Sequence, residues 1–329
     1  MLAVLAACSQ RTTPAETADP LARSAHPAAR SAAPNTAEPT STAANTADSS
    51  PPPGTATQPP GAAPQIATET DGTHIEYHIY GHGEPAVVLI HGWATDANYW
   101  NAQLQPLQAR YTVVTLDLAG HGASTRNRSD WSMPAYGEDV AVVAGQLTNR
   151  QIVLVGHAMG ATVALEACSR IGARVIGIIG VDAWKSIGLP PLPAADINAR
   201  VAPFRADFIG RTRSYVTESL FPKDANPTFS QKVAYDMSLE AAEVAIPSLQ
   251  ALLAVDLNPL LRATHVPLLA INSDMETTDV ARIRRLVPDF HVDVIPHSSH
   301  FLMMDDAARF NPLLLKDIAL LQQRAGSQR

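Results

Sequence analysis

The sequence is short of cysteine, of lysine and of long apolar runs, and each shortage argues against a class of protein. Two cysteines in 329 residues cannot build a disulfide framework. No apolar run approaches the ~20 residues that a bilayer-spanning helix needs. Four lysines accompany 20 arginines, and the formal net charge is −7. No strongly basic face is predicted from this balance, so we expect no nucleic-acid partner.

Aromatic residues are also absent from the first part of the chain, before Tyr77. Residues 9–66 hold 11 of the 26 prolines, and Ala, Thr and Ser make up most of the remainder. A segment of this composition cannot bury enough apolar surface to offset the conformational entropy lost on ordering. We therefore expect residues 9–66 to form a disordered linker and a folded domain to begin near residue 67.

A single cysteine closes the short apolar stretch at the start of the chain. Residues 5–8, Leu-Ala-Ala-Cys, resemble the lipobox of bacterial lipoproteins, in which a signal segment is cleaved and the exposed cysteine is acylated. The resemblance implies an exported chain that touches a membrane only through lipid on Cys8. Because Ser9 is not Asp, we expect sorting to the outer membrane, on its periplasmic side. A periplasmic or secreted protein with an Ala-rich tail is the alternative.

Residues 1–8 are shorter than a signal peptide, which runs about 15–30 residues and has a cationic start. Seven uncharged residues precede Cys8. We therefore expect the natural start of the chain to lie upstream.

From residue 73 onward, strand patterns alternate with helical ones. Residues 73–80 alternate apolar and polar side chains, as a half-buried strand does. Mainly apolar runs, typical of strands covered on both faces, lie at 86–90, 112–116, 151–155, 175–181 and 267–271, and 291–295 is the last predicted strand. Helical patterns lie between them, at 133–147, 158–170, 280–287 and 306–323. This alternation predicts an α/β protein with a mainly parallel sheet and helices on both faces.

The stretch from residue 185 to 258 interrupts the alternation. Near its start, Gly188 is followed by five residues of Leu and Pro, and the stretch then turns helical. It carries Phe204, Phe208, Tyr215, Phe221, Phe229 and Tyr235. Because predicted strands flank it, we expect an inserted helical cap over 185–258 and a core made of 67–184 and 259–329. The aromatic side chains are expected to pack the cap against the sheet, with a few lining an apolar pocket instead.

Four short motifs come directly after predicted strands. They are Val87-Val-Leu-Ile-His91-Gly92-Trp93, Asp117-Leu-Ala-Gly120-His121-Gly122-Ala-Ser124, Leu154-Val-Gly156-His157-Ala158-Met159-Gly160 and Ile295-Pro-His297-Ser-Ser-His300-Phe301. Glycine lets the backbone turn sharply at such a strand end. In the second motif, we expect Asp117 and His121 to brace loops.

In this order and at this spacing, the motifs resemble those of the α/β-hydrolase fold family, in its serine-hydrolase form with a helical cap, over residues 70–325. The third motif is similar to the nucleophile elbow G-x-S-x-G, and the first to the loop that helps to form the oxyanion hole. The resemblance implies a mostly parallel sheet of the eight-stranded type, flanked by helices. It also implies hydrolysis of an ester, lactone or amide bond of a small acyl-type substrate through an acyl-enzyme, without a cofactor.

The sequence departs from this family at its most informative position, where Ala158 stands in place of Ser. In such enzymes the serine hydroxyl attacks the carbonyl while a histidine removes its proton, and a methyl group cannot attack. Neither neighbour, His157 or Met159, supplies a nucleophile. We therefore expect hydrolysis to be nearly absent. Three interpretations stay open: an engineered Ser→Ala change, a natural loss that leaves a ligand-binding pseudoenzyme, or cofactor-free chemistry that depends on a His/Asp pair and needs no Ser.

The resemblance also suggests the other catalytic groups. His300 falls where the family keeps its base. Asp274 follows the strand at 267–271, 26 residues before His300, and is our first choice for the acid. Glu276 is an alternative because it fits the family spacing G-x-x-D if Ser273 replaces the glycine. Asp182 is another, because it ends the sixth strand.

The oxyanion hole, by the same resemblance, consists of the backbone N–H groups of Trp93 and Met159. We expect His91, Gly92 and His157 to line the pocket or to make local hydrogen bonds. The sequence has no H-E-x-x-H or C-x-x-C motif, so we expect no metal site.

Overall fold

The computed structural model describes residues 62–327. The predicted lipobox with Cys8 and residues 9–61 of the predicted linker lie outside these residues, so both stay predictions. The first strand begins at Gln65.

Eight strands form one sheet in the spatial order β1-β2-β4-β3-β5-β6-β7-β8. They are β1 (Gln65–Thr68), β2 (His74–Tyr80), β3 (Ala86–Ile90), β4 (Thr112–Leu116), β5 (Ile152–His157), β6 (Val175–Val181), β7 (Leu268–Ser273) and β8 (His291–Ile295). β2 pairs antiparallel with β1 and with β4, and all other pairings are parallel. The predicted mostly parallel sheet is confirmed.

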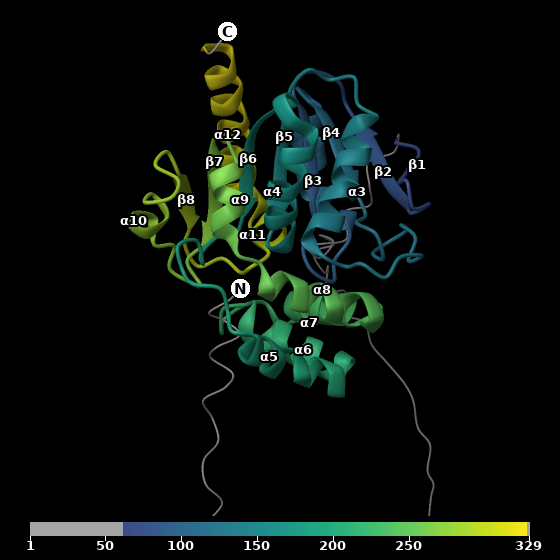
Figure 1. Cartoon of the computed structure of the whole chain (residues 1–329). Helices are drawn as coiled ribbons and strands as arrows, with labels where there is room; N and C mark the ends of the chain where they lie inside the picture. Colours follow the sequence, from purple (N-terminus) through teal and green to yellow (C-terminus); the bar gives the residue numbers. More distant parts are fainter. Residues whose placement is uncertain (1–61, 328–329) are drawn as a thin grey trace, which may run out of the picture.

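Helices cover both faces of the sheet (Figure 1). α3 and α4 pack against each other on one face, and α2 and α12 contact each other on the other. The helices of the core are α2 (Asn101–Gln108), α3 (Met133–Gly145), α4 (Met159–Ile171), α9 (Leu257–Ala263), α10 (Val280–Ile283), α11 (Leu302–Asp305) and α12 (Ala307–Ser327). Because both faces are covered, β3 and β5 are buried along their whole length and consist mainly of Val, Ile and Leu.

Four helices between β6 and α9 form a cap at one end of the sheet, below it in Figure 1. They are α5 (Ala194–Ala206), α6 (Phe208–Ser219), α7 (Pro227–Ser238) and α8 (Ala242–Ala254). Helical structure therefore covers 194–254 of the predicted cap segment, and the residues before it form an irregular connection from β6.

Trp93, in the loop after β3, joins the cap to the core. Its ring lies edge-on to Phe204 and Tyr215, with centroids 5.6 and 6.4 Å away. Its indole Nε1–H donates a hydrogen bond to the carbonyl of Ala245 at 2.7 Å. Edge-to-face aromatic pairs contribute about 0.5–1.5 kcal/mol beyond their buried area. The loop that was expected to form part of the oxyanion hole is thus also the attachment point of α5, α6 and α8.

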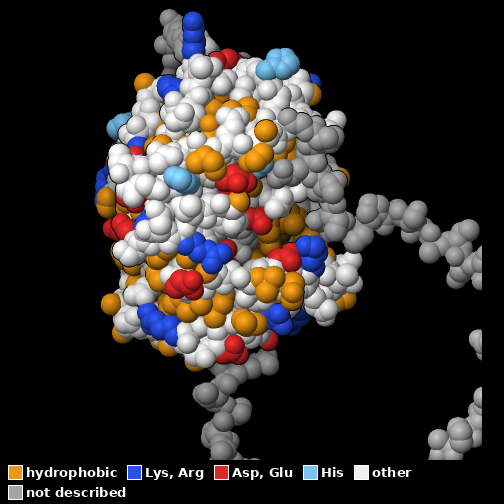
Figure 2. Space-filling view, turned by 90° about the vertical axis from the view of Figure 1, so that its right-hand side faces the viewer, with side chains coloured by type: hydrophobic (Ala, Val, Ile, Leu, Met, Phe, Trp, Pro, Cys, Tyr) orange, Lys and Arg blue, Asp and Glu red, His pale blue; other side chains and the backbone are white. Residues whose placement is uncertain are grey.

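The surface mixes charges of both signs. Figure 2 shows Lys/Arg and Asp/Glu side chains interspersed with hydrophobic ones over the lower part of the molecule, where the cap lies in Figure 1. Exposed hydrophobic side chains of the cap include Ile209, Tyr235 and Leu239. Within residues 62–327, no single helix is long and apolar enough for a bilayer span, and only the pair α8 and α9, bent by 74°, reaches those limits together.

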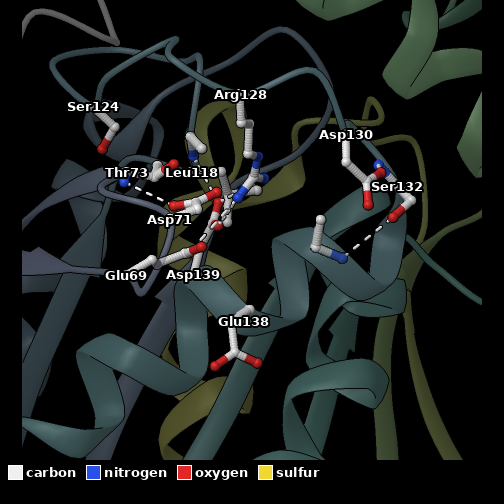
Figure 3. Close-up of polar contacts among 12 residues, drawn as sticks. Glu69, Asp71, Thr73, Leu118, Ser124, Arg128, Asp130, Ser132, Glu138 and Asp139 are labelled. Atoms are coloured by element: carbon white, nitrogen blue, oxygen red, sulfur yellow. Dashed lines mark hydrogen bonds and ion pairs between the residues drawn. The ribbon is translucent and has the colours of Figure 1, made fainter.

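A buried group of charged side chains connects the end of β1 to α3 (Figure 3). Arg128 pairs with the fully buried Asp139, and its Nη1 also lies 3.6 Å from Oε1 of Glu69. Asp139 Oδ2 accepts the N–H of Ala119, in the loop after β4, at 2.7 Å. The cluster therefore fastens three segments that are distant in the sequence.

In this cluster the guanidinium of Arg128 faces the carboxyl groups of Glu69 and Asp139, which also contact each other. Burial, and then the hydrogen bond with Asp139, raises the pKa of Glu69 from 4.5 to about 9. Burial also raises the pKa of Asp139. The folded chain thus keeps a proton between the two carboxyl groups at neutral pH, with Arg128 balancing the remaining charge.

We expect Glu69→Gln to flatten the pH dependence of stability. The folded chain holds a proton that Glu69 releases on unfolding once the pH exceeds 4.5, so the free energy of unfolding falls as the pH rises from 4.5 to about 9. Glutamine keeps the shape and a hydrogen-bond donor but has no proton to lose. Urea denaturation of both chains at about pH 5 and about pH 8 should show the variant gaining relative stability at the higher pH. An identical pH slope in the two chains contradicts the shared proton.

Candidate active site

Ala158 occupies the sharp turn between β5 and α4. Its backbone has φ 49° and ψ −109°, and such a left-handed conformation costs a non-glycine residue about 1–3 kcal/mol. Its N–H donates to the carbonyl of Val181 at 2.9 Å. Gly160 lets the turn pack closely, because a Cβ there would lie 2.4 Å from the carbonyl oxygen of Ile90. The turn is strained and tightly held, and it carries a methyl group at its tip.

His300, in the loop after β8, directs one ring nitrogen at a buried carboxylate. Its Nδ1 lies 2.5 Å from Oδ2 of Asp182, the residue that follows β6. The His300 N–H donates to the carbonyl of Leu220 at 2.9 Å, and His157 Nε2–H donates to the His300 carbonyl at 2.9 Å. With Nδ1–H bound by Asp182, Nε2 is the nitrogen left to take a proton from a reacting group.

Electrostatics keep Asp182 ionised and His300 neutral. Burial acts to raise the pKa of Asp182, but the hydrogen bond from His300 and the charge of Lys185 outweigh burial and hold this pKa well below its usual 3.8. Burial lowers the pKa of His300 below its usual 6.5, although Asp182 opposes the shift. At neutral pH the pair is a carboxylate beside a neutral imidazole, which is the state that a general base requires.

The structure corrects the expected partner of His300, because Asp182 occupies the place predicted for Asp274. Asp274 is exposed, and its Oδ1 accepts the N–H of His297 at 2.9 Å, so it braces the loop after β8. Glu276, two residues further along, is likewise not the carboxylate at Nδ1.

The order of the strands explains this correction. β6 lies next to β5, which leads into the turn at Ala158, whereas β7 is one strand further away. The end of β7 supports the Asp182 carboxylate instead of supplying a carboxylate to His300. Ser273, the last residue of β7, donates both its N–H and its hydroxyl to Asp182 Oδ1, each at 2.8 Å.

Lys185 is a member of the site that the sequence reasoning missed. Its Nζ lies 2.7 Å from Asp182 Oδ1 and donates to Ser273 Oγ at 3.4 Å. The side chain is only 4% exposed. The available signal was a rare lysine, three residues after Asp182, in the stretch 183–192, where Ser186 is the other polar residue. In the sequence, Lys185 is only the first residue of the predicted cap.

The groups expected to form the oxyanion hole lie on either side of the turn. Met159 is the first residue of α4, so its N–H points out of the helix end and has no acceptor within the helix. Trp93 follows Gly92, and a Cβ on that glycine would lie 2.8 Å from Nδ1 of His157. The absence of a side chain at Gly92 therefore lets the loop after β3 approach the end of β5.

Two of the expected pocket histidines are neutral and buried. His91 uses both ring nitrogens on the backbone: Nδ1–H donates to the Gly92 carbonyl and Nε2 accepts the N–H of Leu118, each at 2.9 Å. Burial lowers the pKa of His91 to about 4 and that of His157 to about 3. His91 thus braces two loops, and His157 supports the loop of His300.

Two cavities open onto Ala158. The smaller, of about 230 Å³, is lined by Trp93, His157, Ala158, Tyr215, Leu220, Met237, His300 and Phe301. The larger, of about 600 Å³, has Ala158, Asp182 and Lys185 in its wall, together with side chains of α4 and α8 and of the segments on either side of the cap. Among residues 62–327, no three His, Cys, Asp or Glu side chains are placed to hold a metal ion. Ala158 thus lies in the wall of both cavities, and His300 lies in the wall of the smaller one.

Comparison with known proteins agrees with this architecture. The model of the Alpha/beta hydrolase family matches residues 87–313. An esterase from Exiguobacterium antarcticum superposes with a TM-score of 0.68 at 20% identity, over 78% of this chain and 99% of that one. A non-heme chloroperoxidase from Kitasatospora aureofaciens is 26% identical over 274 residues, which are 76% of this chain and 98% of the relative.

Relatives with a higher sequence identity match only a shorter segment of this chain. An uncharacterized protein of Mycobacterium tuberculosis is 35% identical over 107 residues, 32% of this chain and 31% of that protein. The chain thus matches about a third of the length of such relatives. The family model, by contrast, spans the sheet from β3 to β8, the turn at Ala158, the cap and His300. On that match, the chain belongs to the α/β hydrolase family.

Proposed function

We propose that this protein is a disabled relative of the serine hydrolases, which binds small esters, lactones or amides and hydrolyses them only very slowly. The observation that carries the proposal is the methyl group of Ala158 at a strained turn beside an intact His300–Asp182 pair. The turn corresponds to the nucleophile elbow, where the side chain attacks the carbonyl carbon. The family match and the esterase neighbour support this class of chemistry.

The remaining groups keep their functions without the hydroxyl. His300 offers Nε2 as base, and Asp182 fixes its orientation and would stabilise the imidazolium. The N–H groups of Trp93 and Met159 would bind the carbonyl oxygen as it gains negative charge. These groups bind and polarise an acyl compound, but no covalent acyl-enzyme can form on a methyl carbon. In well-studied serine hydrolases, loss of the nucleophile costs roughly 10⁶-fold in kcat.

We expect Ala158→Ser to restore esterase activity to the full chain. The test is the hydrolysis of short- and medium-chain p-nitrophenyl esters, with the native chain measured beside the variant. The variant should exceed the native chain by at least about 10⁴-fold in kcat/KM for its best substrate. Turnover by neither chain contradicts a preformed serine-type site. Substantial turnover by the native chain, lost in His300→Ala, would instead favour His/Asp-dependent chemistry that needs no serine.

The identity of the acid can be tested with a matched pair of variants in the Ala158→Ser background. Adding Asp182→Asn should lower kcat by roughly 10³–10⁴-fold, because the amide no longer fixes the Nδ1–H tautomer or stabilises the imidazolium. Adding Asp274→Asn removes a carboxylate of the same kind from the neighbouring strand end, away from His300, and should leave kcat unchanged. A large loss with Asp274→Asn and none with Asp182→Asn would reverse the assignment.

A further inference from the structure

A buried lysine forms part of the wall of the larger cavity. Lys185 Nζ belongs to a side chain that is 4% exposed, and the residue forms part of the cavity wall together with Ala158. A charge in such surroundings is costly unless it is paired. Asp182 Oδ1, at 2.7 Å, is its counter-charge. The position of Lys185 is therefore fixed by the same carboxylate that orients His300.

The partners of this group leave hydrogen-bonding capacity for a ligand. An ammonium has three N–H donors. Within residues 62–327, its acceptors are Asp182 Oδ1 and, at 3.4 Å, Ser273 Oγ. Asp182 follows β6, and Ser273 is the last residue of β7. At least one N–H of Lys185 therefore has no acceptor among these residues, in a side chain that forms part of the cavity wall.

The rest of the cavity favours a mainly apolar ligand. Its wall also includes the apolar side chains of Leu252, Leu253, Val255 and Leu257, together with Ala158. In an apolar environment a hydrogen bond to a charged donor is stronger than in water, and leaving that donor unpaired is costly. A ligand with an oxygen beside Lys185 is thus expected to bind more tightly than a ligand with a methylene at the same place.

The charge balance decides which kind of oxygen fits. Lys185 and Asp182 neutralise each other, and burial keeps His300 neutral. A carboxylate on the ligand would bring an uncompensated negative charge into the cavity, whereas a carbonyl or ether oxygen would not.

We propose that Lys185 is a specificity-determining residue that selects acyl compounds carrying an uncharged oxygen acceptor, a carbonyl or an ether, in the acyl chain. This inference rests on the proposed function, because it assumes that acyl compounds occupy the cavity above Ala158. It adds the substrate class: oxygen-substituted acyl groups are preferred over plain alkanoyl groups of the same size.

A matched pair of probes tests the proposal on the native full chain. Phenyl methoxyacetate and phenyl butanoate differ in one position, where an ether oxygen replaces a methylene. With four lysines in the chain, lysine labelled with carbon-13 at Cε gives four signals, and Lys185→Met identifies the signal of Lys185 by its loss. We expect the methoxyacetate to bind roughly tenfold more tightly and to shift the Lys185 signal, which the butanoate leaves in place.

Two lysine variants distinguish a specific role of Lys185 from a general effect of losing a lysine. Lys185→Met should bind the two esters equally, whereas Lys223→Met, at an exposed cap position, should keep the preference. If Lys185→Met does not fold, Lys185→Gln serves for assignment, and the comparison of the two esters on the native chain needs no variant.

Equal binding of the two esters with an unmoved Lys185 signal overturns the inference but not the proposed function. Binding of neither ester up to its solubility limit also overturns it, and turnover by Ala158→Ser then decides the proposed function separately.

Discussion

The buried carboxylate of Asp182 is the group on which the rest of the site depends. A buried anion persists only when it is paired and hydrogen-bonded. β7 contributes the N–H and hydroxyl of Ser273, the connection after β6 contributes the Lys185 ammonium, and the loop after β8 contributes the Nδ1–H of His300. Two strand ends and a loop are therefore tied together at one point of the sheet edge. Removing Lys185 would leave the carboxylate without its counter-charge, and removing Ser273 or His300 would leave it without the hydrogen bonds that these residues donate.

The turn at Ala158 and the base are positioned through the same network. His157, the last residue of β5, holds the carbonyl of His300, and the cap holds its N–H through Leu220. Trp93 fastens the cap to the loop after β3. In each of these contacts the atoms belong to residues other than Ala158. The hydroxyl of a serine can therefore be absent from this turn without disturbing these contacts, which explains how the His300–Asp182 pair coexists with a methyl group at position 158.

Most of the architecture is predictable from the sequence because local patterns encode it. Apolar runs mark the buried strands, and the Gly-His-Ala-Met-Gly turn and His300 belong to short motifs at strand ends. The acid is not predictable in this way. Asp182 and His300 are 118 residues apart, and the choice between Asp182 and Asp274 depends on strand order and on the path of a loop. Lys185 is missed for a similar reason: its burial follows from a contact with Asp182, and a lysine in a connecting segment is ordinarily solvated.

The central claim is that the site lacks only a nucleophile at position 158. Intact-mass spectrometry of the Ala158→Ser chain after exposure to an alkyl fluorophosphonate tests this claim directly, because such reagents phosphonylate a serine hydroxyl that a neighbouring base activates. We predict one adduct, located at position 158, which is absent from the native chain and from the Ala158→Ser/His300→Ala chain. An Ala158→Ser chain that forms no adduct, or forms one at another serine, would contradict the account.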